Sequence, residues 1–536
     1  MAFCLNWATE ALQWAKYAAA VSLIQSDGGY FLPWLAYTGI STAYAALAGL
    51  LISRLSPMAA GSGIPAMRSW INGVDVPRCV APSTLAVKAV GVALAIAAGL
   101  VAGKEGPYIQ CGGIISYLVG CSADACIRRW AVRRFRHEKT KPGKPAPVRG
   151  PRRWLRGWLR AALRALAVVE PREASDYASV GTSGGVAVAF NAPVAGMAYA
   201  AEEGNTVYSV AMLWKAVFAA GAAIWMMQLL GVAAQGQSLL VDSQITLLNN
   251  LSFRGPSEVS SIFWYHSWEV PLMALLGGAI GLLGALWTSA CIAILKWRAS
   301  WIPESRPGLR NLEVAVCAAV TATVWFTVCY ASPCIPIPPS AAAVTAANGH
   351  HFTRDYFNGP GSLWPRLWCR EPGTYASWAQ LFAMPIEGAV RALMSVQPAA
   401  AVAGDGGGLA VVPSENFVFT YSTLGLFVAC AFTGLLLTYG IAAPTGIFIP
   451  TMAIGAAVGR LAGHGVQAVL LAAGLQLQVS LPTWAAVGAA GLLAGNTRLL
   501  LSTVLIVTET TGSAPALVPI ILATVVSKLV ADALTK

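Results

Sequence analysis

Long apolar stretches separated by short polar segments recur along the whole chain. A membrane hydrocarbon core requires about 20 apolar residues in a helix. Such stretches lie at residues 33–53, 85–102, 178–201, 207–233, 270–296, 312–331, 418–440, 447–471, 484–508 and 515–534. The pattern predicts an all-α polytopic membrane protein. Apolar residues already recur from Met1 to Trp14 without the basic segment of a signal peptide, so we expect the chain to begin inside its first membrane element.

Many of these stretches are short or are interrupted by Gly and Pro. Unpaired backbone cannot face lipid, so breaks at membrane depth indicate backbone that lines a cavity. We divide the chain into two transmembrane halves, 1–233 and 270–536, joined by a polar connection at 234–269. Each half contains a Gly/Pro-rich turn, at 59–65 and at 442–450. Matched interruptions of this kind predict an inverted repeat of short, tilted and broken helices with a site near the membrane midplane.

Composition supports a membrane protein, and the charge distribution indicates its orientation. The 536 residues are 56% hydrophobic and only 11% charged, whereas soluble domains are about 25% charged. The net charge of +12 comes from one loop, because residues 127–172 contain 15 Lys and Arg against two acids. The positive-inside rule places this loop in the cytosol. The charge therefore gives no evidence for a nucleic-acid partner, and the amphipathic segment 152–164 is expected to lie on the membrane surface.

The polar segments 234–269 and 332–372 are predicted to lie on the opposite, non-cytosolic side. The first contains a glycosylation sequon at Asn250, and the second contains Cys334 and Cys369, which can form a disulfide there. His350 and its neighbour His351 lack further ligands at a useful spacing, so we expect no metal. No nucleophile–base pair or nucleotide-binding loop is found, so we expect neither an enzyme nor a cofactor.

The first motif with chemical meaning is Gly103-Lys104-Glu105-Gly106-Pro107, at the end of an apolar stretch. Its Gly and Pro residues allow a helix to begin there, and free N–H groups at a helix start attract anions. A carboxylate tethered at that point would compete with an anion for the same amides. The motif therefore indicates either a gate that opens when the glutamate is protonated or an interfacial Lys–Glu pair.

Glycine and proline also allow a helix to begin at two further turns, Gly61-Ser62-Gly63-Ile64-Pro65 and Gly446-Ile447-Phe448-Ile449-Pro450. Glycine allows the backbone to approach a ligand closely, and Ser62 adds a hydroxyl donor for an anion. Phe190-Asn191-Ala192-Pro193, followed by Glu202-Glu203, is a fourth unusual segment. The two acids are either an interfacial stop or a proton entry site.

These four motifs, in this order and spacing, resemble the CLC family of chloride channels and transporters. The resemblance extends from about residue 40 to residue 534. It implies a CLC-type inverted repeat and a homodimer with one anion pathway in each subunit. Lys104, together with the Glu-Glu-Gly at 202–204, is similar to the endosomal and lysosomal exchanger branch, which implies an endosomal, lysosomal or vacuolar membrane of a eukaryote.

The resemblance also implies roles for individual residues. Ser62 and the backbone amides of Ile447 and Phe448 would hold the central chloride, and Ser62 favours chloride over nitrate. Glu105 would be the outer gating glutamate, and Glu203 the inner proton glutamate that marks exchangers. The remaining expected chloride-binding positions are Gly63, Ile64, Lys104, Gly106 and Gly446.

Two positions depart from the family pattern. Ala66 stands where a glutamate is usual, and an alignment without insertions places Ala516 where a tyrosine contacts the anion. The expected function is exchange of two chloride ions for one proton. The alternatives are a passive chloride channel, which Ala516 favours, and a truncated form that does not transport. The family's cytosolic CBS domains are not expected within 1–536, and an accessory subunit is left open.

Overall fold

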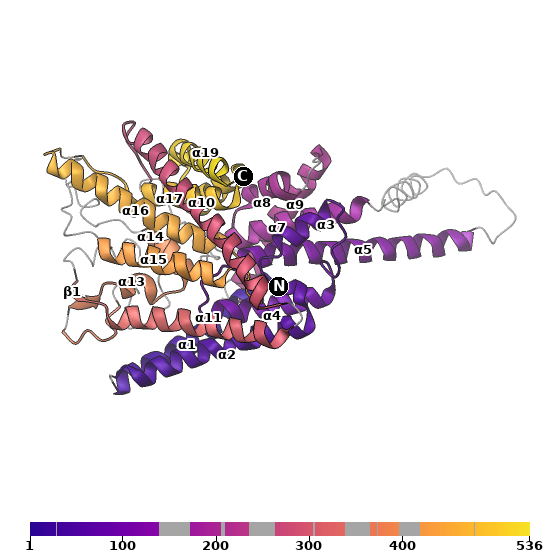
Figure 1. Ribbon diagram of the computed structural model, residues 1–536. Helices are drawn as coiled ribbons and strands as arrows, with labels where there is room; N and C mark the ends of the chain where they lie inside the picture. Colours follow the sequence, from indigo (N-terminus) through magenta and orange to yellow (C-terminus); the bar gives the residue numbers. More distant parts are fainter. Residues whose placement is uncertain are drawn as a thin grey trace.

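The computed structural model describes residues 1–27, 29–138, 172–204, 209–234, 263–303, 306–337, 365–371, 373–395, 419–475 and 477–535. The elements up to residue 234 are α1 (Ala2–Asp27), α2 (Phe31–Leu55), η1 (Pro57–Ala59), α3 (Ile64–Ile71), α4 (Pro82–Ala97), α5 (Glu105–Glu138), α7 (Arg172–Phe190), α8 (Pro193–Tyr199), the π-helical η2 (Ala200–Gly204) and α9 (Val210–Ala234). Those that follow are α10 (Glu269–Trp301), α11 (Pro307–Tyr330), β1 (Cys334–Pro336), β2 (Thr374–Ala376), α13 (Ala379–Phe382), α14 (Ile386–Ser395), α15 (Tyr421–Thr438), α16 (Phe448–Ala472), α17 (Leu481–Thr497), α18 (Leu501–Thr511), η6 (Ala514–Ala516) and α19 (Leu517–Leu534). The all-α prediction is confirmed, and the tilted helices are shown in Figure 1.

Seven of the described helices are long and apolar enough to cross a membrane: α2, α9, α10, α11, α15, α16 and α19. Two other apolar stretches form the shorter helices α4 and α18. The 16 residues of α4 are about 24 Å long at 1.5 Å per residue, less than the hydrocarbon core of about 30 Å. The end of α4 is therefore expected at membrane depth, and the turn that follows it leads to Glu105.

Two of the apolar stretches are broken helices rather than continuous ones. The stretch 178–201 divides into α7 and α8 at Asn191, whose φ is +53°, and Pro193 begins α8. Proline has no N–H to donate, so it suits the first turn of a helix. The stretch 484–508 divides into α17 and α18 at Arg498, whose φ is +65°. Each break creates a helix start beside the core of the molecule.

The inverted repeat is visible in corresponding helix pairs of the two halves. Helices α5 and α16 each begin at a Gly/Pro motif and pack against the next long helix, α7 and α17 respectively. A Cβ atom on Gly112 would collide with the Gly181 carbonyl, and one on Gly455 would collide with that of Gly488. Glycine therefore allows the same close helix contact in both halves, as is usual in membrane proteins.

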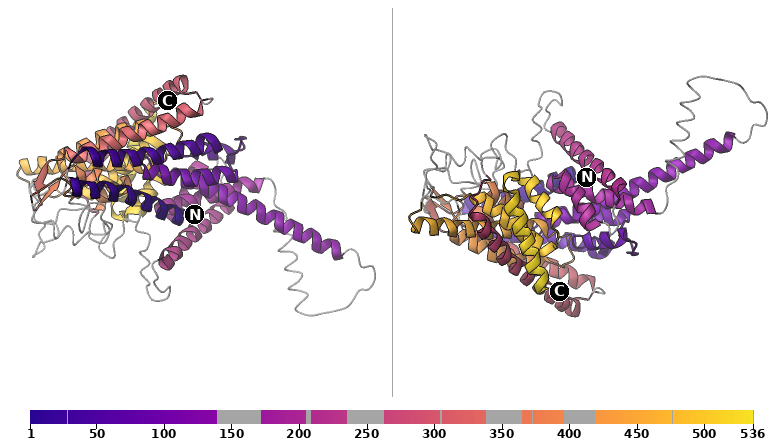
Figure 2. Two further views of the ribbon diagram at one scale, coloured as in Figure 1. Left: turned by 90° about the horizontal axis from the view of Figure 1, so that it is seen from below. Right: turned by 90° about the horizontal axis from the view of Figure 1, so that it is seen from above.

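The two ends of the molecule differ in character. Figures 1 and 2 show α5 extending from one end of the bundle, with the antiparallel pair β1 and β2 at the other. A disulfide joins Cys334 and Cys369 beside β1, which confirms that pairing. The segment 139–171 with most of the basic loop, the sequon at Asn250 and His350-His351 lie outside the described residues.

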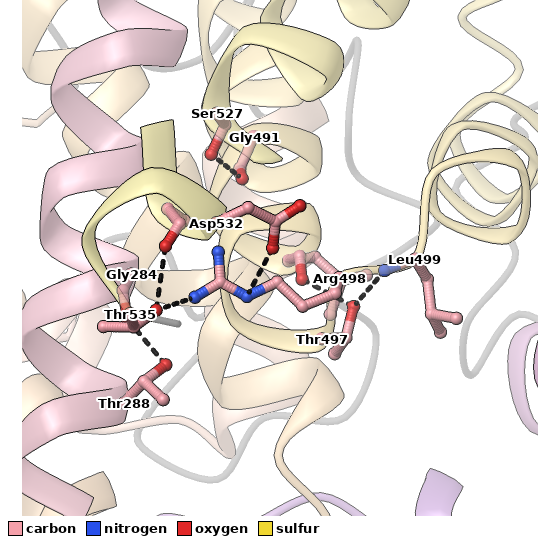
Figure 3. Close-up of polar contacts among 11 residues, drawn as sticks. Gly284, Thr288, Gly491, Thr497, Arg498, Leu499, Ser527, Asp532 and Thr535 are labelled. Atoms are coloured by element: carbon pink, nitrogen blue, oxygen red, sulfur yellow. Dashed lines mark hydrogen bonds and ion pairs between the residues drawn. The ribbon is translucent and has the colours of Figure 1, made fainter. Parts of the chain in front are cut away.

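The break between α17 and α18 is tied to the end of α19. The Nε atom of Arg498 lies 3.5 Å from Oδ1 of Asp532, and the same guanidinium donates to Thr535 (Figure 3). Nearby, Ser527 donates to the Gly491 carbonyl at 2.7 Å, so α19 also binds to the body of α17. These contacts fix the direction in which α18 leaves the turn.

Candidate functional site

Three sequence motifs from both halves of the chain meet at one point. Gly103 and Gly446 form an isolated antiparallel bridge in which each N–H donates to the other's carbonyl, at 2.7 and 2.8 Å. The N–H of Gly61 donates to the Ala443 carbonyl at 2.8 Å. The turns at 61–65 and 103–107 are thereby joined to the turn before α16, although more than 300 residues separate them in sequence.

Small residues are required where the turns touch. A Cβ atom on Gly446 would lie 2.8 Å from the Gly103 carbonyl oxygen, and one on Gly106 would lie 2.7 Å from the Cβ of Ser62. Atoms this close repel each other, so any side chain at either position would push the turns apart. The glycines of these motifs are therefore explained by backbone packing between the turns.

Three helices begin at the meeting point, namely α3 at Ile64, α5 at Glu105 and α16 at Phe448. No side chain caps the start of α3 or α16 by the usual hydrogen bond. The Ser62 hydroxyl oxygen accepts a long hydrogen bond of 3.4 Å from the Ile64 N–H, which leaves its own proton available to donate. Free N–H groups and aligned helix dipoles make this point suitable for an anion.

The Glu105 side chain lies directly in this region. It is fully buried, and neither carboxylate oxygen has a hydrogen-bond partner among the described residues. A Cβ atom on Gly103 would collide with this carboxylate, so the side chain lies against the Gly103–Gly446 bridge. A buried carboxylate without a partner is unfavourable, which makes Glu105 a candidate functional residue.

Lys104 points to a different element from Glu105. Its Nζ atom lies 2.9 Å from Oε2 of Glu387, near the start of α14, and both side chains are largely buried. The Lys–Glu pair is therefore formed with Glu387, a partner 283 residues away, rather than with the adjacent Glu105. The positive charge of Lys104 lies near Glu105 but is partly neutralised by Glu387.

The fourth motif also reaches this region. The ring of Phe190, which ends α7, makes an edge contact with the ring of Phe448 at a centroid distance of 5.8 Å. Phe448 is the first residue of α16. The break between α7 and α8 is thus placed beside the helix start that we expect to face the anion.

Glu203 forms an ion pair that the sequence motifs did not indicate. Its Oε1 atom lies 2.9 Å from Nη1 of Arg68, on the helix α3 that follows Ser62. The Glu203 side chain is 19% exposed, and that of Arg68 is 54% exposed. Asn72 at the end of α3 donates to the Gly204 carbonyl at 3.2 Å, which holds the same turn. Glu203 is therefore connected to the Ser62 turn through α3 and has access to solvent beside Arg68.

Glu202, the neighbour of Glu203, has a separate role as a helix cap. Its two carboxylate oxygens accept from the backbone N–H groups of Leu500, Leu501 and Ser502 at the start of α18, and from the Ser502 hydroxyl. In return Glu509, near the end of α18, accepts from the N–H groups of Val194 and Ala195 at the start of α8. The helices α8 and α18 thus cap each other, which satisfies N–H groups exposed by the two helix breaks.

The two departures from the family pattern have ordinary packing environments. Ala66 is half-buried on α3 and packs against a small cluster around Met67 and Ile71. Ala516 is fully buried in the turn η6 immediately before α19. The described residues contain no group of three or more His, Cys, Asp or Glu side chains that could hold a metal ion.

A helical bundle with an inverted repeat, in which broken helices of both halves begin at one buried point, defines a membrane transport protein. A family model described as voltage gated chloride channel matches residues 44–532. The chain belongs to this family, and the resemblance drawn from the motifs is confirmed.

Among curated proteins, the chain is 27% identical over 508 residues to the H(+)/Cl(-) exchange transporter 7 of Bos taurus. That match covers 94% of this chain and 53% of the relative. It is 28% identical over 505 residues to the chloride channel protein CLC-c of Arabidopsis thaliana, covering 94% of this chain and 55% of the relative. The chain therefore spans about half the length of these relatives.

Solved structures support the fold. A crystal structure of a eukaryotic CLC transporter matches with a TM-score of 0.59 and 21% identity, covering 100% of this chain and 70% of that one. A cyanobacterial Cl-/H+ antiporter described as slow matches with a TM-score of 0.63 and 19% identity, covering 99% of this chain and 91% of the other. At this level of identity the two structures show the fold alone.

Proposed function

We propose that the protein exchanges chloride for protons across a membrane, moving two chloride ions one way for each proton moved the other way. The observation that carries this proposal is the buried, unpartnered Glu105 carboxylate at a point where three helices begin. The names of the relatives, which include exchange transporters and an antiporter, support exchange.

In the proposed mechanism, chloride binds where the Glu105 carboxylate and the helix starts face each other. The donors are the Ser62 hydroxyl and the backbone N–H groups of Ile447 and Phe448. The turn residues Gly63, Ile64, Gly106 and Gly446 allow the anion to approach the backbone. The site uses neutral N–H groups, so it binds chloride without a counter-charge that would trap the ion.

Glu105 acts as the gate because its carboxylate and chloride cannot occupy the same amides. A proton on Glu105 removes the negative charge that opposes the anion, and the neutral side chain leaves the pathway. Release of the proton returns the carboxylate and displaces chloride. One side chain thereby carries the proton and controls the anion.

Glu203 supplies the second proton position in this proposal. It lies near the molecular surface beside Arg68, while the N-terminal end of α3 contains the Ser62 turn. Its partial exposure allows exchange with solvent protons. Protons reach Glu105 from Glu203 by a route separate from the anion donors.

The proposal includes a homodimer in an endosomal, lysosomal or vacuolar membrane, with loop 127–172 in the cytosol. Large apolar side chains are exposed along one face of α9, including Trp214, Phe218 and Trp225. Such a face requires lipid or a second subunit to cover it.

A flux assay tests the exchange. The purified protein in liposomes should move protons inward against their gradient when a chloride gradient is imposed. Glu105→Gln and Glu203→Gln should each abolish proton movement, since an amide does not titrate in this range, and chloride flux should persist in Glu203→Gln. Glu371→Gln, at an exposed loop position, is the matched control and should retain coupling.

Three results would contradict parts of the proposal. Chloride flux without proton movement would identify a passive channel. Absence of any flux from intact dimers would identify a form that does not transport. Unaltered coupling in both glutamate variants would show that the proton takes another path.

A further inference from the structure

A small cavity with both polar and apolar lining lies beside the turn between α4 and α5. It has a volume of about 40 Å³ and lies between α1, α2, the turn after α4, α11 and the start of α14. The residues that line it include Gln13, Lys16, Tyr37, Val101, Trp325 and Glu387. A cavity needs only about 10–15 Å³ to hold one water molecule, so this one has room for a small ion with solvent. Its lining does not include Ser62 or the start of α16.

Lys16 is the unusual residue of this cavity. Its side chain is buried, with 1% exposure, and the contacts of its ammonium among the described residues are with two aromatic rings. The Nζ atom lies 4.7 Å from the ring centroid of Tyr37 and 5.2 Å from that of Tyr17. Ring faces compensate a buried ammonium only in part, and its three N–H donors still require acceptors.

The neighbouring charges do not supply that acceptor. Glu387 lines the same cavity, but its carboxylate is paired with Lys104 at 2.9 Å. Arg391, one turn further along α14, interacts electrostatically with both Glu387 and Glu10. Glu10, Glu387 and the nearby Glu105 equal in number the three cations Lys16, Lys104 and Arg391, but among the described residues none of these carboxylates is paired with the ammonium of Lys16.

The surroundings of Lys16 otherwise favour donors. The Gln13 amide donates weakly to the Ile96 carbonyl at 3.5 Å, and the cavity includes Tyr17 as well as Tyr37. A Cβ atom on Gly99 would lie 3.0 Å from Nζ of Lys16, so the ammonium lies just beyond the end of α4. Burial disfavours the charged form of Lys16, and the negative end of the α4 dipole offsets that cost only in part, so the ammonium still requires a counter-ion.

We propose that this cavity binds a halide ion on the Lys16 ammonium, as a second anion site outside the transport pathway. The ion would complete the hydrogen bonds of Lys16 and supply the negative charge that this ammonium lacks. Its position also connects it to the gate, because Gly99 and Gly103 belong to the same turn and Glu387 pairs with Lys104. A helix outside the matched family region, α1, supplies the binding cation.

Bromide, which scatters X-rays anomalously and replaces chloride, tests the proposal on the whole protein. Crystals grown in bromide should show an anomalous peak at hydrogen-bond distance from Lys16 Nζ, in addition to the peak beside Ser62. Lys16→Met should lose the first peak and keep the second. Lys296→Met, an exposed lysine on α10, is the matched control and should keep both.

Equilibrium binding of radioactive chloride to the purified protein gives an independent count. The wild type should bind one more chloride ion per chain than Lys16→Met, and the same number as Lys296→Met. A peak beside Ser62 with water alone at Lys16 in the wild-type crystal would overturn the second site while leaving the proposed pathway intact. A peak at Lys16 without one beside Ser62 would support the second site and contradict the proposed chloride site of the pathway.

Discussion

Glu202 and Glu203 are adjacent in sequence but have different partners. Successive residues of a helical turn point in different directions, so the pair does not act as one unit. Glu202 accepts from three backbone N–H groups of α18, whereas Glu203 pairs with the half-exposed Arg68. Stability should depend on the first residue and proton coupling on the second.

This difference predicts that two matched substitutions affect different properties, stability for Glu202 and proton flux for Glu203. Glu202→Gln should lower the unfolding free energy by about 1–2 kcal/mol, because it weakens a charged cap. Glu203→Gln should change it by less than about 1 kcal/mol, because its partner Arg68 is 54% exposed and solvent screens the pair. Thermal unfolding of the detergent-purified variants measures the first effect, and proton flux measures the second. Equal destabilisation by both substitutions would contradict the prediction that the Glu202 cap of α18 stabilises the fold more than the Glu203–Arg68 pair does.

The bridge between Gly103 and Gly446 predicts a second effect at this scale. Gly446→Ala should reduce chloride flux by about tenfold or more, because an added methyl group cannot fit 2.8 Å from a carbonyl oxygen and the turns must separate. Gly39→Ala, in α2 with no atom within 4 Å of the new Cβ, is the control and should preserve flux. If Gly446→Ala kept the wild-type chloride flux, the turns could separate without disturbing chloride transport, which would contradict the prediction.

At this scale the motifs predicted which residues meet but not which charges pair. The Gly-rich turns were recognised because glycine and proline restrict the backbone locally, and the turns do converge. The partners Glu387 of Lys104 and Arg68 of Glu203 lie 283 and 135 residues away. No local pattern specifies such pairs, because they depend on how α14 and α3 pack.

An ion pair joins the helix α14 to the turn that carries Lys104 and Glu105. Helix α14 also lies against α16, where Arg460 donates to the Ala392 and Leu393 carbonyls. Its first turn contains Glu387, which binds Lys104. Breaking this pair leaves the buried ammonium of Lys104 without its ion-pair partner.

Glu387→Ala should therefore lower the unfolding free energy by about 3 kcal/mol, the usual effect of removing one partner of a buried pair. The control is Asp176→Ala, which breaks the exposed Lys215–Asp176 contact of 3.9 Å and should cost less than about 1 kcal/mol. Thermal unfolding followed by circular dichroism compares the two. Similar shifts would show that Lys104 finds another partner or solvent.

Apolar periodicity predicted many of the helices, but not the helix breaks and not α1, α5 or α14, which lie outside the ten apolar stretches. Most of those stretches correspond to one helix each. Breaks at Asn191 and Arg498 arise because left-handed backbone conformations and capping carboxylates stabilise new helix starts. Those carboxylates come from the other half of the chain, so the sequence around each break does not contain the full signal.

For the whole molecule, the disulfide and the basic loop predict an orientation. The Cys334–Cys369 bond and the outward end of α5 lie at opposite ends of the bundle (Figure 1). In sealed vesicles whose outer face exposes loop 127–172, external trypsin should cleave that loop. A reductant that cannot cross membranes should leave the disulfide intact until detergent is added. Reduction and cleavage from the same side would contradict the orientation.

The mutual capping of α8 and α18 has a consequence for the synthesis of the chain. Proteins are made from the N-terminus, and early segments fold before later ones are available. The acceptor for the Val194 and Ala195 N–H groups is Glu509, more than 300 residues later in the sequence. The start of α8 therefore remains uncapped until nearly all of the chain has been inserted. A ribosome that stalls before α18 leaves a first half with exposed amides at membrane depth, which is a form that cellular quality control can recognise.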